Sequence, residues 1–510
     1  MLSAFALAST LVCAALAQND TLSTLRVTFD RPDYARYLNP TLAGLSIELD
    51  RFPDWAGNLS HPNEYTHALL DNLKQRTGAA VTIRVGGGTQ DRAVITPSVE
   101  VYEDVFPAVP ANYTSTKQLF PEANYVAVGK GFYLTSGNFP SGTQFIWGVD
   151  LMKNNVSEAK AQVQAIKDAF QDSRLSHVRL QSLEFGNEPD SWANNGRPAN
   201  WTLLQYADQY ASWVDQISSE LNEHSIKFQI GSFAAYWRAV ELFSSGVLST
   251  DLGKRANSMS EHHYQNLNLV QSLTPSNLIN KAGVRGNLSQ YTASADASHA
   301  SGLRFYLGET NTGFSHGVAG VSNANAAALW LIDYALQAAT LGIDELHFHQ
   351  GVGYNYSAFV PIDNVGSLNI TDYNPSAKRH ILPSYNGFVV VADAIGTSGK
   401  TWMSELYTDN LNLAAYSVYE DKTLRRIVLI DSVPWLQEPA IKVGIPRIAG
   451  KNARLKRLAV PSLDGLSGIT WGGQNWETYN GTVNGTEQYE NVAADGSVTI
   501  EASSAVLIYL

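Results

Sequence analysis

Several kinds of chemistry are excluded by what this sequence lacks. Only one of its 510 residues is cysteine, Cys13, so neither a disulfide framework nor a thiol nucleophile is expected. Lysine and arginine number 35 against 47 acidic residues, for a net charge of −12, and no basic cluster is present to bind nucleic acid. Hydrophobic residues reach 44%, which excludes disorder and predicts a chain stabilised by its core.

Long apolar runs are also absent beyond the first residues. Met1 to Ala17 has an apolar core and ends in Ala15-Leu16-Ala17, a pattern typical of a secretory signal peptide, although its basic region is limited to the terminal amine. We therefore expect a secreted, extracellular protein that does not span a membrane. Ten Asn-X-Ser/Thr sequons support glycosylation: Asn19, Asn58, Asn112, Asn155, Asn200, Asn287, Asn355, Asn369, Asn480 and Asn484.

The stretch Ser182–Asp190 combines a strand pattern with a carboxylate at its end. Alternating apolar residues predict a strand that runs to Glu188, where Pro189 stops it. Glu309 ends a second apolar run, Arg304–Glu309, in the same way. The two glutamates lie 121 residues apart, about three units of a (β/α)8 barrel at roughly 30–45 residues each. Both carboxylates can therefore face one cleft.

Eight candidate strands alternate with helical patterns along residues 41–384, which predicts an α/β fold, a (β/α)8 TIM barrel. The candidates are Gly44–Leu49, Ala80–Val85, Gln144–Leu151, Ser182–Glu188, Lys227–Phe233, Ser258–Tyr264, Arg304–Glu309 and Glu345–Gln350. Ser60 and Ser157 are candidate N-caps of two intervening helices. The insertion 90–143 is expected to shape one wall of the cleft.

The sequence pattern changes after the predicted barrel. Short alternating segments between turns predict a C-terminal antiparallel β-sandwich over residues 385–510. The strand near Arg26, within residues 18–40, has no place in the barrel, and we expect it to join this domain. Trp471, Trp476 and Tyr479 are interpreted as buried aromatic residues at a domain seam rather than as a sugar platform.

Paired carboxylates are the chemical groups of glycoside hydrolysis, one as acid and one as nucleophile or base. Asn187 can bind the hydroxyl next to the anomeric carbon, and Tyr264 can hold the attacking carboxylate. The remaining strand-end residues expected at the cleft are Glu48, Arg84, Asp150 and Gln350. Arg84 can pair with Glu184 or Glu309, and a supporting ion pair with Glu184 is favoured. His262 and His263 lack a third ligand at regular spacing, so they are interpreted as core histidines, and no metal and no cofactor is expected.

These motifs resemble the retaining glycoside hydrolases of clan A, and more closely family 79, which includes β-glucuronidases and heparanase. The resemblance covers most of the chain and suggests a fungal secreted member. It rests on Gly44–Leu49, Arg84–Asp91, Glu184–Pro189, His262–Tyr264, Gly308–Thr310 and Tyr354–Tyr356, followed by the β domain.

The resemblance implies a role for individual residues. Glu188 matches the acid/base and Glu309 the nucleophile, while Glu48 matches the residue that binds distal sugar hydroxyls. The other matching substrate-binding positions are Thr89, Asn187, Tyr264, Phe314 and Tyr356, the last at the sugar carboxylate. Phe314 replaces a tyrosine found in family members. Asn355 then lies at the cleft and is a poor glycan acceptor, unlike the other nine sequons.

The expected function is a retaining exo-β-glucuronidase that releases terminal β-glucuronic acid, with or without a 4-O-methyl group, by double displacement. Its expected partner is a carbohydrate substrate, with no nucleic acid and no membrane. Two alternatives stay open: a clan A β-glycosidase acting on a neutral sugar, and a non-catalytic secreted carbohydrate-binding protein.

Overall fold

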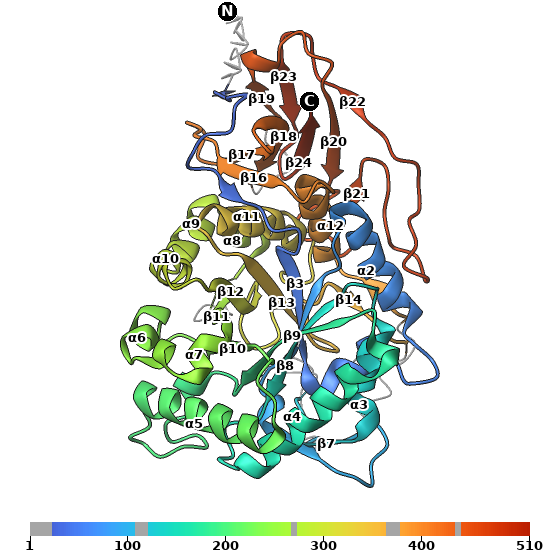
Figure 1. Cartoon of the computed structure of the whole chain (residues 1–510). Helices are drawn as coiled ribbons and strands as arrows, with labels where there is room; N and C mark the ends of the chain where they lie inside the picture. Colours follow the sequence, from blue (N-terminus) through green and yellow to red (C-terminus); the bar gives the residue numbers. More distant parts are fainter. Residues whose placement is uncertain (1–22, 108–120, 267–272, 364–377, 434–439) are drawn as a thin grey trace, which may run out of the picture.

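A closed barrel of parallel strands forms the centre of the molecule (Figure 1). The structure, a computed structural model, describes residues 23–107, 121–266, 273–363, 378–433 and 440–510. The expected signal peptide and three sequons, at Asn19, Asn112 and Asn369, lie outside these residues. The barrel strands, in order around the barrel, are β3 (Ala43–Glu48), β4 (Thr82–Gly86), β8 (Gln144–Val149), β9 (Arg179–Phe185), β10 (Phe228–Phe233), β11 (Ala256–Tyr264), β12 (Arg304–Asn311) and β13 (Glu345–Gln350).

The predicted barrel is confirmed, and its strands coincide with the eight predicted segments to within a few residues. One end differs in a way that matters for the site. Strand β9 ends at Phe185 rather than at Glu188, because the backbone turns there: Gly186 has φ 78° and Glu188 has φ 52°. Glu188 is therefore presented by a tight turn and not by the alternation of a strand.

Helices surround the barrel. Their bounds are α1 (Phe52–Ala56), α2 (Glu64–Thr77), α3 (Lys130–Leu134), α4 (Val156–Gln171), α5 (Leu203–Leu221), α6 (Ala239–Ser244), α7 (Asp251–Arg255), α8 (Pro275–Leu278), α9 (Lys281–Ser289), α10 (Thr292–Ala300), α11 (Ala326–Thr340) and α12 (Ser384–Ile395). None of the helices in the described part of the chain has the length and apolarity needed to cross a membrane.

Two predicted helix caps were wrong. Asn63, not Ser60, caps α2, because its side chain accepts hydrogen bonds from the amides of Tyr65 and Thr66. Asn155, not Ser157, caps α4 and accepts from the amide of Glu158. Asparagine is as good an N-cap as serine, so the residue type alone could not choose between neighbouring candidates.

The insertion after β4 forms a small sheet of its own beside the barrel. It contains β5 (Ala93–Ile95), β6 (Tyr102–Val105) and β7 (Tyr125–Val128), in the order β5-β7-β6. Helix α3 follows and packs on α4. A short two-stranded ribbon, β14 (Phe359–Val360) with β15 (His380–Ile381), follows the last barrel strand.

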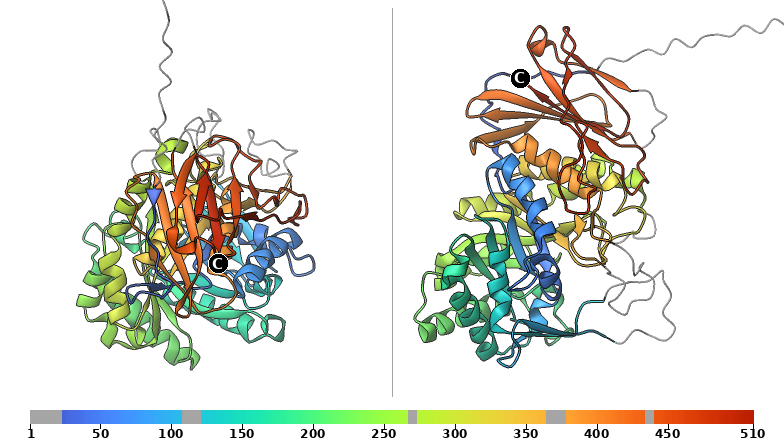
Figure 2. Two further views of the ribbon diagram at one scale, coloured as in Figure 1. Left: turned by 90° about the horizontal axis from the view of Figure 1, so that it is seen from above. Right: turned by 90° about the vertical axis from the view of Figure 1, so that its right-hand side faces the viewer.

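Two sheets form the C-terminal domain, which stands at one side of the barrel (Figure 2). The small sheet contains β1 (Ser23–Thr24), β19 (Ile441–Gly444) and β23 (Ser497–Ile500). The large sheet contains β2 (Arg36–Tyr37), β16 (Thr401–Glu405), β17 (Leu413–Glu420), β18 (Thr423–Asp431), β24 (Ala505–Tyr509), β20 (Arg454–Ala459), β21 (Thr470–Trp471) and β22 (Glu490–Asn491). The amino-terminal segment thus contributes one strand to each sheet.

Both faces of the large sheet are buried, which explains why its strands are so apolar. On β17, Leu413 and Ala415 face the small sheet, while Ala414, Tyr416 and Val418 belong to the same core as the barrel helices. A strand buried on both faces reads as a continuous hydrophobic run. The β domain therefore shares a core with the barrel.

The expected domain boundary at residue 384 needs correction. Helix α12 begins there and packs against α2 and α11, so it closes the ring of barrel helices. Its apolar sequence, Phe388 to Val391, resembles a strand because the helix is buried between the barrel and the β domain. The transition to the β domain therefore falls after Ile395.

Asp393 on α12 holds the seam between the two domains. Its carboxylate accepts hydrogen bonds from Arg76 Nη1, Lys456 Nζ and Trp471 Nε1, each at 2.7 Å. Trp471 and Trp476 are fully buried, as predicted, but Tyr479 is 51% exposed, so the prediction was wrong for that residue. Burial opposes the charge, but Arg76 and Lys456 outweigh it and lower the pKa of Asp393. The carboxylate therefore stabilises the fold at pH values above its unfolded pKa, and that stability is lost as the pH falls.

We expect Asp393→Asn to lower the free energy of unfolding at pH 7 by about 3 kcal/mol, since it leaves buried Lys456 with a single carboxylate partner, Glu487. Urea unfolding measures the loss. Asp421→Asn is the matched control, because its exposed carboxylate lies 3.9 Å from Lys400 and exposed pairs contribute less than about 1 kcal/mol. Equal effects of the two substitutions would contradict a stabilising seam.

Candidate active site

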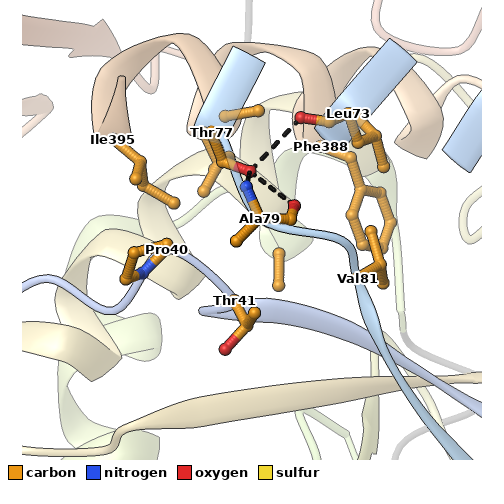
Figure 3. A pocket seen from close by; sticks show the side chains of 11 residues that line it. Pro40, Thr41, Leu73, Thr77, Ala79, Val81, Phe388 and Ile395 are labelled. Carbon is orange, nitrogen blue, oxygen red and sulfur yellow. Dashed lines mark hydrogen bonds between the residues drawn. The ribbon is translucent and has the colours of Figure 1, made fainter. Parts of the chain in front are cut away.

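The two ends of the barrel differ in what they enclose. At the amino-terminal ends of β3 and β4, a cavity of only about 20 Å³ lies among side chains such as Val81, Leu73 and Phe388 (Figure 3). At the carboxyl ends, a cavity of about 430 Å³ opens, which lies in the range of small-molecule sites. Polar and charged residues line it, including Glu48, Asp91, Arg92, Glu122, Asn187, Glu188, Tyr264, Glu309, His316, His349 and Tyr356.

A turn presents Glu188 to this cavity, and hydrogen bonds from two backbone amides hold this turn in place. The amide of Asn187 donates to Asp91 Oδ2 at 2.8 Å, and the amide of Glu188 donates to Ser232 O at 3.0 Å. Gly186 is required before it, because a Cβ there would lie 2.5 Å from the Trp192 ring. These contacts hold Glu188 in the left-handed region, a conformation that costs about 1–3 kcal/mol for a residue other than glycine.

Glu309 lies on strand β12, and neighbouring side chains contact both oxygens of its carboxylate. Arg84 Nη1 donates to its Oε2 at 2.8 Å, and the Tyr264 hydroxyl donates to its Oε1 at 2.7 Å. His349 Nδ1 lies 3.7 Å from Oε2. The side chain keeps only 8% of its surface accessible, so it is a fixed carboxylate at the floor of the cavity.

The two glutamates are close enough to act on one bond. A carboxylate oxygen of Glu188, a ring nitrogen of His262 and a carboxylate oxygen of Glu309 all lie within 4.8 Å of one another. Retaining glycosidases place their carboxyl groups about 5–5.5 Å apart, whereas inverting ones leave roughly 6.5–9.5 Å for a water molecule. The spacing fits direct attack on the sugar.

Comparisons with known proteins point to glycoside hydrolases. Residues 415–507 match the model of the glycosyl hydrolase family 79 C-terminal beta domain. A β-glucuronidase of Aspergillus niger is 29% identical, covering 96% of this chain and 94% of the relative, and one of Neurospora crassa is 25% identical over 96% and 97%. These findings together support membership of glycoside hydrolase family 79.

Solved structures share the fold of this chain. The 4-O-α-L-rhamnosyl-β-D-glucuronidase of Fusarium oxysporum has a TM-score of 0.78 at 22% identity, covering 96% of this chain and 100% of that one. A family 51 α-L-arabinofuranosidase of Bifidobacterium longum has a TM-score of 0.62 at 12% identity, covering 96% and 99%. The barrel and its β domain are therefore common to enzymes that cleave different sugars.

The environments of the two glutamates push their pKa values apart. Burial raises the pKa of Glu188, and the negative charge of Glu309 adds to this, although a hydrogen bond from His262 opposes it. Burial would raise the pKa of Glu309 too, but positive charge on His349, His262 and Arg84 outweighs it, and the pKa is lowered. Paired carboxyls with opposite shifts mark an acid and a nucleophile.

Arg84 joins the supporting residues into one network. It is fully buried and donates to Glu184 Oε1 at 3.0 and 2.6 Å, as well as to Glu309 and to Asn187 Oδ1 at 2.8 Å. The sequence left open whether Arg84 pairs with Glu184 or with Glu309, and in the structure it pairs with both. Gln229 donates to the other oxygen of Glu184, so each buried charge has a partner.

The other predicted binding residues also line or support the cavity. Glu48 accepts from the amide of Thr89 at 2.8 Å and from its hydroxyl, and it lies 3.1 Å from His349 Nε2. Gly87 is needed beside it, because a Cβ there would lie 2.1 Å from the Glu48 carboxylate. Tyr356 is buried in the wall, and Phe314 is 49% exposed at the rim.

Two strand-end residues predicted for the cleft lie elsewhere. Asp150 points toward the loop after β8 and accepts from the amide of Lys153. Gln350 accepts from the amide of Ala358 and holds the loop after β13. Both positions end barrel strands, but their side chains satisfy backbone groups of the loops instead of facing substrate. A position at the end of a strand does not by itself show whether the side chain faces the substrate or binds the backbone of a loop.

Three functional candidates were missed by sequence reasoning: His262, Glu122 and His316. His262, interpreted there as a core histidine, lies 3.0 Å from Glu188 Oε1 through Nδ1 and 2.9 Å from Ser232 Oγ through Nε2. Glu122 lines the cavity, where its Oε2 lies 3.1 Å from Arg92 Nη1 and its Oε1 lies 3.8 Å from His316 Nε2. Glu122 comes from the long insertion and His316 from the loop after β12, so no spacing in the sequence connects them.

Glu188, His262 and Glu309 are also the one group of potential metal ligands found among the described residues. Their atoms are already engaged: His262 by Ser232 and Glu188, and Glu309 by Arg84 and Tyr264. A cation placed there would lie close to the guanidinium of Arg84. The arrangement therefore suits proton transfer better than metal binding.

His262→Ala should raise the pKa of Glu188 further, because the substitution removes a hydrogen bond and a positive charge that favour the ionised form. Carboxyl ¹³C NMR titration of glutamate-labelled protein measures the shift, with Glu188→Gln identifying the resonance. His299→Ala is the control, since His299 pairs with Asp344 on the surface. An unchanged or lowered value in His262→Ala would contradict the assigned contact.

Proposed function

We propose that this chain is a retaining exo-β-glucuronidase. The observation that carries the proposal is the pair of glutamates in one cavity, with oxygens within 4.8 Å and with pKa values shifted in opposite directions. The relatives from Aspergillus niger and Neurospora crassa, both β-glucuronidases, support the choice of sugar. The cavity of about 430 Å³ lies in the range of small-molecule sites and can hold a single sugar residue.

In the first step, ionised Glu309 attacks the anomeric carbon. Protonated Glu188 donates its proton to the glycosidic oxygen as the carbon–oxygen bond breaks, and the aglycone leaves as an alcohol. The bond from Glu309 to the sugar forms through an oxocarbenium-like transition state. Arg84 and Tyr264 keep the nucleophile oriented and ionised, so little reorganisation is needed when attack begins.

In the second step, Glu188 acts as a base instead of an acid. Now a carboxylate, it takes a proton from water as the water oxygen attacks the anomeric carbon, and Glu309 leaves with its bonding electrons. Two inversions at that carbon give net retention. The hydrogen bond to His262 stabilises the ionised form of Glu188 that this step requires.

The sugar carboxylate has donors on the loop after β12. Ser315 has φ 55° and His316 φ 69°, and their amides donate to no acceptor among the residues that the structure describes. Successive free amides in a turn form an anion-binding concavity. Tyr356 and the imidazole of His316 face the same cavity. We infer that these groups bind the C5 carboxylate, without the hydroxyl that Phe314 lacks.

The remaining hydroxyls have partners on the opposite side. We infer that Glu48, fixed by Thr89 and His349, accepts hydrogen bonds from the distal hydroxyls. Asn187, held by Arg84, faces the hydroxyl next to the anomeric carbon, where such bonds strengthen in the transition state. Glu122 adds a second acceptor for sugar hydroxyls or for a substituent on them.

The test is the release of nitrophenol from aryl β-D-glucuronide, compared with the matching β-D-glucoside. We expect hydrolysis of the glucuronide alone, with loss of kcat/KM at high pH as Glu188 ionises. Glu309→Gln should abolish turnover. Glu188→Gln should lower it by about 10²–10⁴-fold for a poor leaving group, and Glu220→Gln on the exposed face of α5 is the matched control.

Other outcomes are equally informative. Hydrolysis of the glucoside alone would keep the two-glutamate mechanism and discard the carboxylate subsite at Ser315 and His316. Binding of both sugars without any release of nitrophenol would contradict an enzyme and favour a carbohydrate-binding protein.

A further inference from the structure

A second cavity opens beside the first and shares the proposed acid with it. Its volume is about 310 Å³, and Glu188, Ser191, Tyr264 and Phe314 line both cavities. The remaining wall comes from the loop after β10 and from the segment around Tyr291. Glu309, in contrast, lines only the larger cavity.

We propose that this second cavity is the leaving-group subsite and that it binds a neutral ring with an apolar face, stacked on Tyr236. The inference rests on the function proposed above and adds the chemical class of the aglycone. The ring can belong to an aryl group or to an uncharged pyranose, because both present the same apolar face to an aromatic side chain.

The position follows from the geometry of displacement. The nucleophile and the leaving group lie on opposite sides of the anomeric carbon, and the acid must reach the oxygen that joins sugar to aglycone. The larger cavity contains both glutamates and therefore takes the sugar that is attacked. The smaller one contacts Glu188 but not Glu309, which is what a site for the departing alcohol requires.

The lining favours a flat and apolar ligand. Tyr236 is 73% exposed and Phe314 is 49% exposed, although both are large aromatic side chains. Ala234 and Ala235 leave room beside them. Stacking on aromatic rings gains roughly 0.5–1.5 kcal/mol beyond area burial, so an exposed tyrosine in a cavity next to the acid is a suitable platform.

A charged aglycone is disfavoured because Arg238, the one arginine or lysine that lines this cavity among the described residues, is already paired. Arg238 donates to Glu261 Oε2 at 2.7 Å and to Gln290 Oε1 at 2.9 Å, and its guanidinium lies over the Tyr291 ring. Its charge is therefore already compensated by Glu261, which is buried. Arg238 is therefore not free to attract a sulfate or a carboxylate, and the ring nitrogens of His262 are engaged by Glu188 and Ser232.

The wall is tied to the turn that holds Glu188. Asp190, two residues after Glu188, accepts from the amides of Ala234, Ala235 and Tyr236 at 2.9, 2.9 and 2.8 Å. It is 8% exposed, so these bonds lie away from water. The platform and the acid therefore keep a fixed relation to each other, as a subsite for the leaving group needs.

The test compares substrates that differ only in the leaving group. Aryl β-D-glucuronide and a β-D-glucuronyl-galactose disaccharide place a ring in the subsite, whereas β-D-glucuronyl fluoride places a single atom. We expect Tyr236→Ala to lower the ratio of kcat/KM for a ring substrate to kcat/KM for the fluoride by roughly fivefold to tenfold. Tyr236→Phe should restore the ratio, and Tyr407→Ala, 88% exposed in the β domain, should not change it.

The outcomes separate the two proposals. If Tyr236→Ala lowers the ratio for the aryl substrate, the subsite binds an aromatic aglycone. If it lowers the ratio for the disaccharide, the subsite binds a sugar. Either result supports the subsite. Ratios that do not change in Tyr236→Ala would overturn it. If the wild-type protein hydrolyses none of the three glucuronides, the proposed function itself has failed.

Discussion

The site depends on one buried cation. Arg84 lies below the cavity with no exposed surface and contacts Glu184, Glu309 and Asn187 at once. A buried charge without partners is very costly, so the arginine requires the two carboxylates, and they require it. Glu184 fixes the guanidinium, and the guanidinium fixes the carboxylate proposed to attack the sugar. The barrel supplies the geometry, because these residues come from three different strands.

The second glutamate is controlled differently, by backbone contacts instead of charge. The turn after β9 holds Glu188 in a left-handed conformation through Asp91, Ser232 and the packing of Gly186 against Trp192. Asp190 then extends the same turn to the loop after β10. One carboxylate is therefore kept ionised by positive charge on His349, His262 and Arg84, while the other is buried near it and favours its neutral form. Two identical side chains acquire two roles from their surroundings.

Much of this could be predicted from the sequence. Apolar runs ending in a carboxylate predicted the strands of Glu188 and Glu309, since a barrel brings the carboxyl ends of its strands together. The turn at Glu188 and the contact with His262 could not be predicted, because they depend on packing between neighbouring strands. Glu122 and His316 come from separate loops that converge only in the folded chain. Most of helix α12 was included in the expected β domain, because its packing against α2 and α11 is a property of the folded chain.

The most direct test of the account is to trap the sugar on the protein. Incubation with 2-deoxy-2-fluoro-β-D-glucuronyl fluoride, followed by peptide mass spectrometry, identifies the residue that carries the covalent bond. The account predicts one added 2-fluoroglucuronyl group, attached to Glu309 and absent from Glu309→Gln. Labelling of Glu188 instead, or turnover by the wild-type protein with inversion at the anomeric carbon, would contradict it.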